Sequence, residues 1–158
     1  MTPKQFFTRL QTDLKALVWE GTANKIFGTS VWVVPEIPIR QLSEWSAPSC
    51  FILDQGFVND GEHPGIGTQN FGITFFVENV QQNMGEGGIL SANRVANTSA
   101  GAGSLDIEEE LIMYFIEKLS LTTKIMIVEK SKPKLQIVAN NNPLLLNRWT
   151  FRTLLGYY

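Results

Sequence analysis

The apolar positions of the first eighteen residues recur three and four residues apart, which predicts an amphipathic helix. Thr2 and Gln5 have the spacing of a capping box, and Pro3 occupies the favoured first helical position. Gly21 is predicted to end the helix. The apolar face of this helix consists of Phe6, Phe7, Leu10, Leu14, Leu17 and Val18.

Short runs of β-branched and aromatic residues predict strands in the next third of the chain. The first run, 31–34, stops at Pro35, and the second, 49–54, lies between Pro48 and Gly56. The segment RQLSEWSAP between them predicts a short helix of one or two turns. The order expected here is strand, short helix, strand.

An alternation of apolar residues with largely small or polar ones follows over 71–77 and predicts a strand with one buried face. Such a strand belongs to a sheet that is covered on one side. The preceding segment, 55–69, holds four glycines, a proline and the single histidine, so we expect an irregular loop there. The residues predicted to share the buried face are Phe71, Ile73, Phe75 and Val77.

The segment 83–104 is long, small, polar and rich in glycine, and we expect it to be a mobile loop without secondary structure. Ser104 is predicted to cap a second helix, whose first turns carry carboxylates that suit the positive end of the helix dipole. These carboxylates are Asp106, Glu108, Glu109 and Glu110, and the predicted buried stripe is Leu111, Ile112, Phe115 and Leu119.

Two further apolar runs, 125–129 and 135–139, are joined by KSKPK and predict a hairpin with a lysine-rich turn. The last segment, 148–158, alternates apolar with basic residues and predicts a strand with one apolar and one basic face. The fold class expected is α+β, a largely antiparallel or mixed sheet with two main helices packed on one face. The 158 residues fit a single domain spanning 1–158.

Composition places the chain among globular proteins, since 44% of its residues are hydrophobic and 18% are charged. The formal charge of −2 hides an asymmetry between the two parts of the chain. Residues 1–118 hold seven Lys and Arg against fourteen Asp and Glu, whereas residues 119–158 hold six basic residues against Glu129 alone. Opposite charges of this kind can steer self-association or a partner.

Candidate catalytic chemistry is sparse. The glycines before the second helix complete neither a dinucleotide fingerprint nor a P-loop, and His63 has no companion metal ligands in its segment. Cys50 lies in an apolar run and is expected to be a buried small hydrophobe. We therefore expect no catalytic residue, no metal site and no cofactor.

A basic cluster remains, and it admits two interpretations. It could contact phosphates without sequence preference, or it could be a solvated hairpin. No basic reading helix and no RNP-type motif accompanies it. Its members are Lys124, Lys130, Lys132, Lys134, Arg148 and Arg152.

Taken in order, several segments resemble the tail-terminator, or tail-completion, proteins of long-tailed bacteriophages. The segments are VWVVPEIP, APSCFILDQG, EHPGIGTQNF, FGITFFVENV, MGEGGILSANR and SAGAGSLDIEEEL. The best of them, 85–94 and 101–111, correspond to a glycine-containing loop before an acidic helix. The positions that match as assembly-loop residues are Gly85, Glu86, Gly87, Gly88, Arg94, Gly101 and Gly103.

The resemblance implies a structural virion protein that forms a hexameric ring. Such a ring caps the tail tube, ends tube polymerisation and joins the tail to the head connector, with double-stranded DNA passing non-specifically through its lumen. Opposite-sign regions can supply the heterologous interface that ring closure requires. The candidate basic interface is Lys130, Lys132, Lys134, Arg148 and Arg152.

Two alternatives stay open. One is another neck or head-completion protein, and the other is a small α+β ligand-binding or enzymatic domain with the 83–104 segment as a lid. No apolar run approaches the roughly 18 to 20 residues of a membrane span, and charges interrupt the amino terminus. We therefore expect no membrane partner, synthesis in the host cytoplasm, and a final place at the head–tail junction of the virion.

Overall fold

A computed structural model describes residues 1–44, 46–79, 85–91, 94–119, 123–138 and 143–157. In this part of the chain six strands form one mixed sheet with the order β1-β2-β3-β6-β4, and β5 also pairs with β6. β1 and β2 are parallel, whereas the other pairs are antiparallel. The strands are β1 (Val31–Val34), β2 (Ser49–Asn59), β3 (Ile66–Glu78), β4 (Ile125–Lys130), β5 (Lys134–Gln136) and β6 (Leu144–Gly156).

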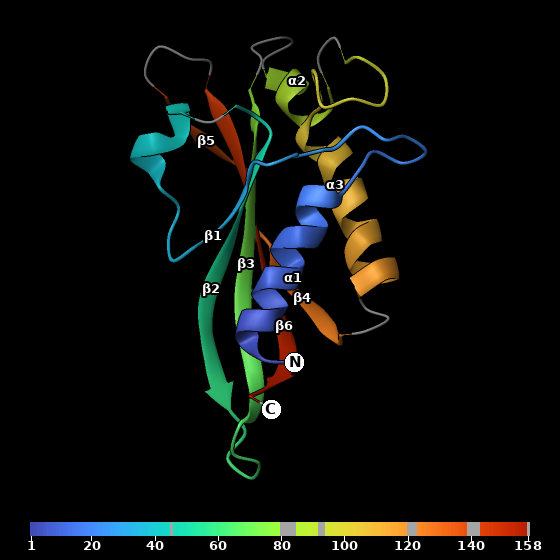
Figure 1. The fold of residues 1–158 in the computed structure, drawn as a ribbon. Coiled ribbons are helices and arrows are strands. Elements are labelled where there is room, and N and C mark those ends of the chain that lie inside the picture. Colours follow the sequence, from blue (N-terminus) through green and yellow to red (C-terminus); the bar gives the residue numbers. More distant parts are fainter. Residues whose placement is uncertain (45, 80–84, 92–93, 120–122, 139–142, 158) are drawn as a thin grey trace.

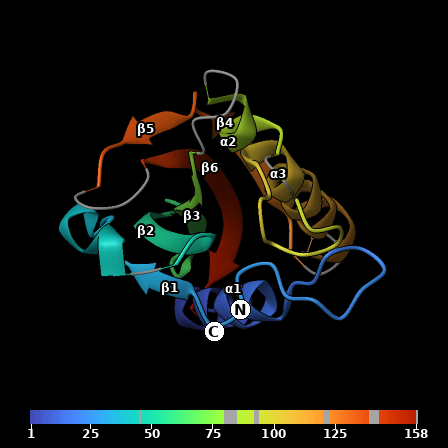
Figure 2. The ribbon, with the colours of Figure 1, turned by 90° about the horizontal axis from the view of Figure 1, so that it is seen from above.

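The two main helices lie on the same side of this sheet, which confirms the α+β prediction. They are α1 (Pro3–Ala16) and α3 (Ser104–Met113), and α3 continues as a π-helix over Tyr114–Leu119. α1 runs along the length of the sheet, with α3 beside it (Figure 1). Seen from above, α3 lies on the convex side of β6, and η1 (Ile39–Glu44), a 3-10 helix, lies on the opposite side of the sheet (Figure 2).

The predicted capping box of α1 is present, since Thr2 accepts a hydrogen bond from the Gln5 amide and Gln5 bonds the Thr2 amide in return. The helix ends at Ala16 and not at Gly21, so the predicted end is wrong. Leu17 and Trp19 are buried in extended backbone there, because the chain leaves the helix to form a bridge between Val18 and Lys25.

An aromatic stack in the core joins α1 to the centre of the sheet. The Phe71 ring on β3 lies 5.1 Å from the Phe6 ring of α1 and 4.9 Å from the Phe151 ring of β6, measured between centroids. The exposed fraction of each of the three side chains is at most 1%. The predicted alternation is confirmed, because Phe71, Ile73, Phe75 and Val77 all belong to this core.

The sheet is covered on both sides at one end, so the prediction of a sheet covered on one side is only half right. Phe51, Phe76 and Leu146 point away from the main helices and pack beneath Leu42 of η1, with Leu144 beside them. The pattern of 71–77 does not indicate this, since the other residues on the side of Phe76, Gly72, Thr74 and Glu78, are small or polar. Beyond η1 the same face of the sheet is open.

The segment 55–69 is not an irregular loop. β2 continues to Asn59 and β3 begins at Ile66, with a β-bulge between Asp54 and Phe57. Gly56 adopts a φ of +98° at the bulge, which a residue with a side chain rarely does. The bulge shifts the register of the pairing, so that Phe57 stands opposite Gln69. Phe57 therefore packs against the main core.

The predicted hairpin of 125–129 and 135–139 is wrong as well. β4 and β5 do not pair with each other, because both pair with β6, one after the other along its free edge. The Ser131 amide donates to the Arg148 carbonyl and keeps the chain on β6 between the two strands. Residue 139 lies outside the described residues.

The start of α3 also differs from the prediction. Gly103 is the N-cap, and its amide donates to the Asp106 carboxylate at 2.9 Å. Ser104 is therefore the first helical residue, and its buried hydroxyl accepts a hydrogen bond from the Asn147 side-chain amide at 2.9 Å. This contact ties α3 to β6.

We predict that Ser104→Ala lowers the free energy of unfolding by about 1 to 3 kcal/mol, because the buried Asn147 amide loses its shorter acceptor. Urea unfolding of Ser104→Ala, Asn147→Leu and the double variant measures the coupling. We expect a coupling of about 0.5 to 3 kcal/mol, since the two side chains share one bond. If Ser104→Ala costs the same amount in the Asn147→Leu variant as in the wild type, the serine acts through its own helix and not through β6.

Candidate functional site

The sheet face that points away from α1 and α3 carries the two arginines of β6. Arg148 stands opposite Thr74 and Arg152 opposite Asn70, and both arginines are exposed. The residues that alternate with them, Trp149 and Phe151, are buried in the main core. The predicted apolar and basic faces of this strand are therefore confirmed. We call this surface the open sheet face. Glu129 also stands on it, opposite Thr150, so the face is basic through its arginines but not free of carboxylates. It comprises Leu53, Gln55, Val58, Thr68, Asn70, Gly72, Thr74, Met126, Glu129, Arg148, Thr150, Arg152 and Leu154.

The other candidate basic residues do not all reach this face. Lys130 stands opposite Trp149 on the helix side of the sheet, with its ammonium 5.4 Å from the Trp149 ring and ion-paired to Glu108 of α3. Lys134 stands opposite Leu146, which belongs to the same side of the sheet as Arg148. Lys132 is exposed between β4 and β5. The predicted cluster thus divides into two groups.

The open sheet face contains a hollow of about 510 Å³ beside Arg148. Gly72 forms part of its floor, where the Gln55 side chain lies so close that a Cβ on residue 72 would stand 3.0 Å from the Gln55 amide nitrogen. Its lining comes from five parts of the chain and is mixed in character. The lining residues are Pro35, Glu36, Ile37, Ile39, Leu53, Gln55, Gly72, Thr74, Ser131, Arg148, Trp149 and Thr150.

Three large apolar side chains are exposed near the far end of this face. Val58, Met126 and Leu154 have exposed fractions of 61%, 60% and 59%. They are close in the sheet because Thr68 pairs with both Val58 and Leu154, and Met126 pairs with Arg152. Exposed apolar groups beside arginines are typical of protein interfaces. No sequence pattern indicated this cluster, since its members come from three separate strands.

The glycine-rich segment has secondary structure in its described part, so that expectation is wrong. It forms a one-turn helix, α2 (Glu86–Ile89), after Gly85, and Ser91 bridges to Ala102. Gly87 and Gly88 are buried within α2. Residues 83, 84, 92 and 93 lie outside the described residues. The mobility of the segment in the isolated chain stays a prediction.

Trp19 anchors the second half of this segment. The Arg94 guanidinium lies 4.4 Å from the centre of the Trp19 ring and donates to Asp106 of α3 at 2.9 Å. The Trp19 indole donates to the Ser99 hydroxyl at 3.1 Å, and that hydroxyl donates to the Ile26 carbonyl at 2.7 Å. Sequence reasoning singled out Arg94 but missed Trp19 and Ser99, which are about 80 positions apart and have no common motif.

Two of the glycines matched to the assembly loop have a local structural role. Gly101 adopts a φ of +72°, in the region that favours glycine. Gly103 passes so close to the end of α2 that a Cβ there would lie 2.5 Å from the Leu90 carbonyl oxygen. Both glycines therefore serve the path of the segment from α2 into α3.

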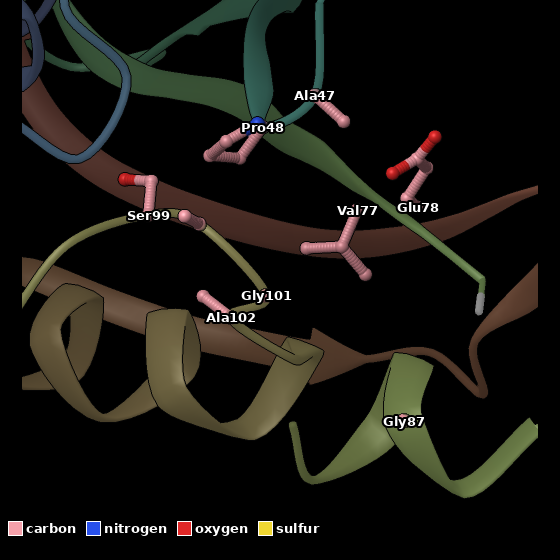
Figure 3. Close-up of a pocket in the computed structure, with 9 residues that line it drawn as sticks. Ala47, Pro48, Val77, Glu78, Gly87, Ser99, Gly101 and Ala102 are labelled. Carbon is pink, nitrogen blue, oxygen red and sulfur yellow. The ribbon is translucent and has the colours of Figure 1, made fainter. Parts of the chain in front are cut away.

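A second hollow, of about 290 Å³, lies between this segment and the start of β2 (Figure 3). It is lined by small residues and by Glu78, and the Ser99 hydroxyl points away from Glu78 in Figure 3. Ser99 is bonded to Trp19 and to the Ile26 backbone, so it is not aligned with a base. The lining residues are Ala47, Pro48, Val77, Glu78, Gly87, Ser99, Ala100, Gly101 and Ala102.

Titratable groups elsewhere have structural partners. His63 lies 3.2 Å from the exposed Asp60 in the β2–β3 turn. The hydrogen bond from the Glu62 amide lowers the pKa of the Asp60 carboxyl most, and the hydrogen bond with His63 lowers it further. Burial and the hydrogen bond to Asp13 raise the pKa of Tyr114 far above its usual range. Burial also raises the pKa of the Cys50 thiol. Within the described ranges no three His, Cys, Asp or Glu residues converge as metal ligands.

No family model matches this chain, and no curated protein matches its sequence. Among the helices of the described residues, none has the length and apolar character needed to cross a membrane.

We predict that Arg94→Gln speeds protease cleavage within 94–103, because the change removes both the ion pair with Asp106 and the contact with the Trp19 ring. Limited proteolysis followed by mass spectrometry locates the cuts, and Arg40→Gln, the same change at an exposed arginine of η1, is the matched control. Equal cleavage rates in the wild type and in Arg94→Gln would show that these contacts do not hold the segment in solution.

Proposed function

We propose that this protein is a ring-forming tail-terminator protein of a long-tailed bacteriophage. The observation that carries the proposal is the open sheet face, where Arg148 and Arg152 stand beside a hollow and three exposed apolar side chains. A face of this composition suits the burial of another protein surface. The resemblance of the segments 85–94 and 101–111 to the assembly loop of such proteins supports the same role.

In this role the protein assembles with copies of itself into a hexameric ring at the end of the tail tube. One side of the ring stops further addition of tube subunits, and the other side receives the connector of the head. Double-stranded DNA passes through the lumen without sequence-specific contacts. Another neck or head-completion protein of the same particle is the nearest alternative function.

A small ligand-binding or enzymatic domain is a second candidate, and the hollow in Figure 3 is the observation that favours it. With about 290 Å³, this hollow is at the lower end of the range for ligand sites. Its small residues and exposed backbone are more consistent with packing against a partner chain than with chemistry on a substrate.

The proposed function predicts that the protein limits tube growth. Purified protein is added to polymerising tail-tube subunits of its own phage, and tube lengths are measured by electron microscopy. We expect short tubes that end in a ring, and particles made without the protein should carry overlong or headless tails. Unchanged tube lengths together with absence from the head–tail junction would contradict the proposal.

We further predict that Arg148→Glu with Arg152→Glu weakens ring formation without unfolding the monomer, because both side chains are exposed and neither contributes to the core. Since screened charges contribute less at high salt, the wild-type ring should itself weaken as salt rises. The control is Lys4→Glu with Lys25→Glu, the same charge change on α1 and the turn beyond it. Light scattering at low salt measures the mass, and a normal ring from the doubly reversed protein would contradict this interface.

A further inference from the structure

The outer surface of α3 is acidic and apolar, whereas the open sheet face is basic and apolar. Glu109, Met113 and Glu117 follow one another at intervals of four residues along α3 and the π-helix that continues it, and Ile116 precedes Glu117. The exposed fractions of Met113 and Ile116 are 46% and 59%, and Leu105 nearer the start of the helix is exposed by 42%. We call this surface the α3 outer face; it comprises Leu105, Glu109, Met113, Ile116 and Glu117.

A groove of about 580 Å³ runs beside this face, between α3 and the chain that follows α1. Four carboxylates line it against a single lysine, so the groove repels anions and favours a basic partner. Its apolar lining includes Leu17, Ile112 and Met113. The charged lining residues are Glu20, Glu109, Glu110, Glu117 and Lys118.

The two faces point in opposite directions. α3 packs on the helix side of β6 through Ile107, Leu111 and Phe115, so its outer face looks away from the sheet. Arg148 and Arg152 project from the other side of that strand. One molecule therefore presents a basic, apolar surface on one side and an acidic, apolar surface on the other. Figure 2 shows that α3 lies on one side of β6 only.

We propose that the α3 outer face of one copy docks on the open sheet face of the next copy. This inference rests on the proposed function and identifies the two surfaces that the ring would join. Glu109 and Glu117 meet Arg148 and Arg152 of the neighbour, while an apolar side chain such as Met113 enters the hollow beside Arg148. The arrangement is head to tail, the kind of contact that closes into a ring when the rotation between copies permits.

Charge decides against the contact of two like faces. If two open sheet faces met, the arginines of one copy would oppose those of the other, and two α3 outer faces would bring carboxylates together. Like charges placed together across an interface disfavour association strongly. The occupant with the right chemistry for either face is thus the opposite face of a second copy.

A charge exchange between the two faces tests this pairing. The sheet-face variant carries Arg148→Glu and Arg152→Glu, so both of its faces are acidic, and the helix-face variant carries Glu109→Lys and Glu117→Lys, so both of its faces are basic. Neither variant should assemble alone, and we expect association at least about tenfold weaker than in the wild type. An equal mixture should recover the wild-type mass, since every contact between unlike variants is again complementary.

The four changes combined in one chain should also recover assembly, with the two polarities exchanged. Light scattering at low salt measures the mass of each assembly, and electron microscopy shows whether a ring caps the tail tubes. Circular dichroism confirms that each variant is folded. If the wild type assembles but neither the mixture nor the fourfold variant does, the pairing is wrong and the proposed function stands. If the wild type neither assembles nor caps tubes, the proposed function fails, and the inference fails with it.

Discussion

The pairing of β3 with β6 is the constraint on which the rest of the structure depends. The two strands stay in one unbroken register from Ile66 opposite Gly156 to Glu78 opposite Leu144. Phe71 and Phe151 stack face to face at its centre, with ring planes 8° apart, and α1 is fixed to this stack through Phe6. Because side chains alternate along a strand, this long register also decides which residues of β6 are buried and which face outward. A shift of one residue would bury Arg148 and Arg152 and expose Trp149 and Phe151.

The same alternation separates the charges of the molecule. Lys130 stands on the helix side, where it pairs with Glu108, and the two arginines stand on the other side. A surface salt bridge of this kind adds little stability, but it occupies one lysine of the basic region with an intramolecular partner. The basic character that remains on this side of the sheet is therefore carried by Arg148 and Arg152 of β6 together with Lys134 of β5. The β6 backbone is held between β3 on one edge and β4 and β5 on the other.

Local patterns predicted many of the elements but not all of their bounds, and not how the strands pair. The capping box of α1, the alternation of 71–77 and the two faces of β6 depend on residues close in sequence, and all three were predicted correctly. The predicted hairpin is wrong because nothing in KSKPK indicates that β6 is long enough to pair with β4 and β5 one after the other. The sequence predicts a loop where the structure has the bulge at Gly56, since glycine is common in both. At the candidate site, the arginines were found from the strand pattern, whereas Trp19, Ser99 and the apolar cluster of Val58, Met126 and Leu154 exist only after folding.

The free edge of the sheet explains why assembly would proceed through faces and not through strand pairing. An exposed edge strand offers unpaired backbone groups to any other chain, and charged residues, proline and short strands suppress that pairing. The edge made by β4 and β5 carries Lys130, Lys132 and Lys134, and Pro133 interrupts it between the two strands. At the other edge, β1 has only four residues, and the Val31 carbonyl already accepts a hydrogen bond from Gln11 of α1. Beyond β1 that edge is formed by β2, where the bulge between Asp54 and Phe57 interrupts regular pairing. With both edges blunted, the surfaces left for a second copy are those whose side chains differ in charge, so association through them is selective and sensitive to salt.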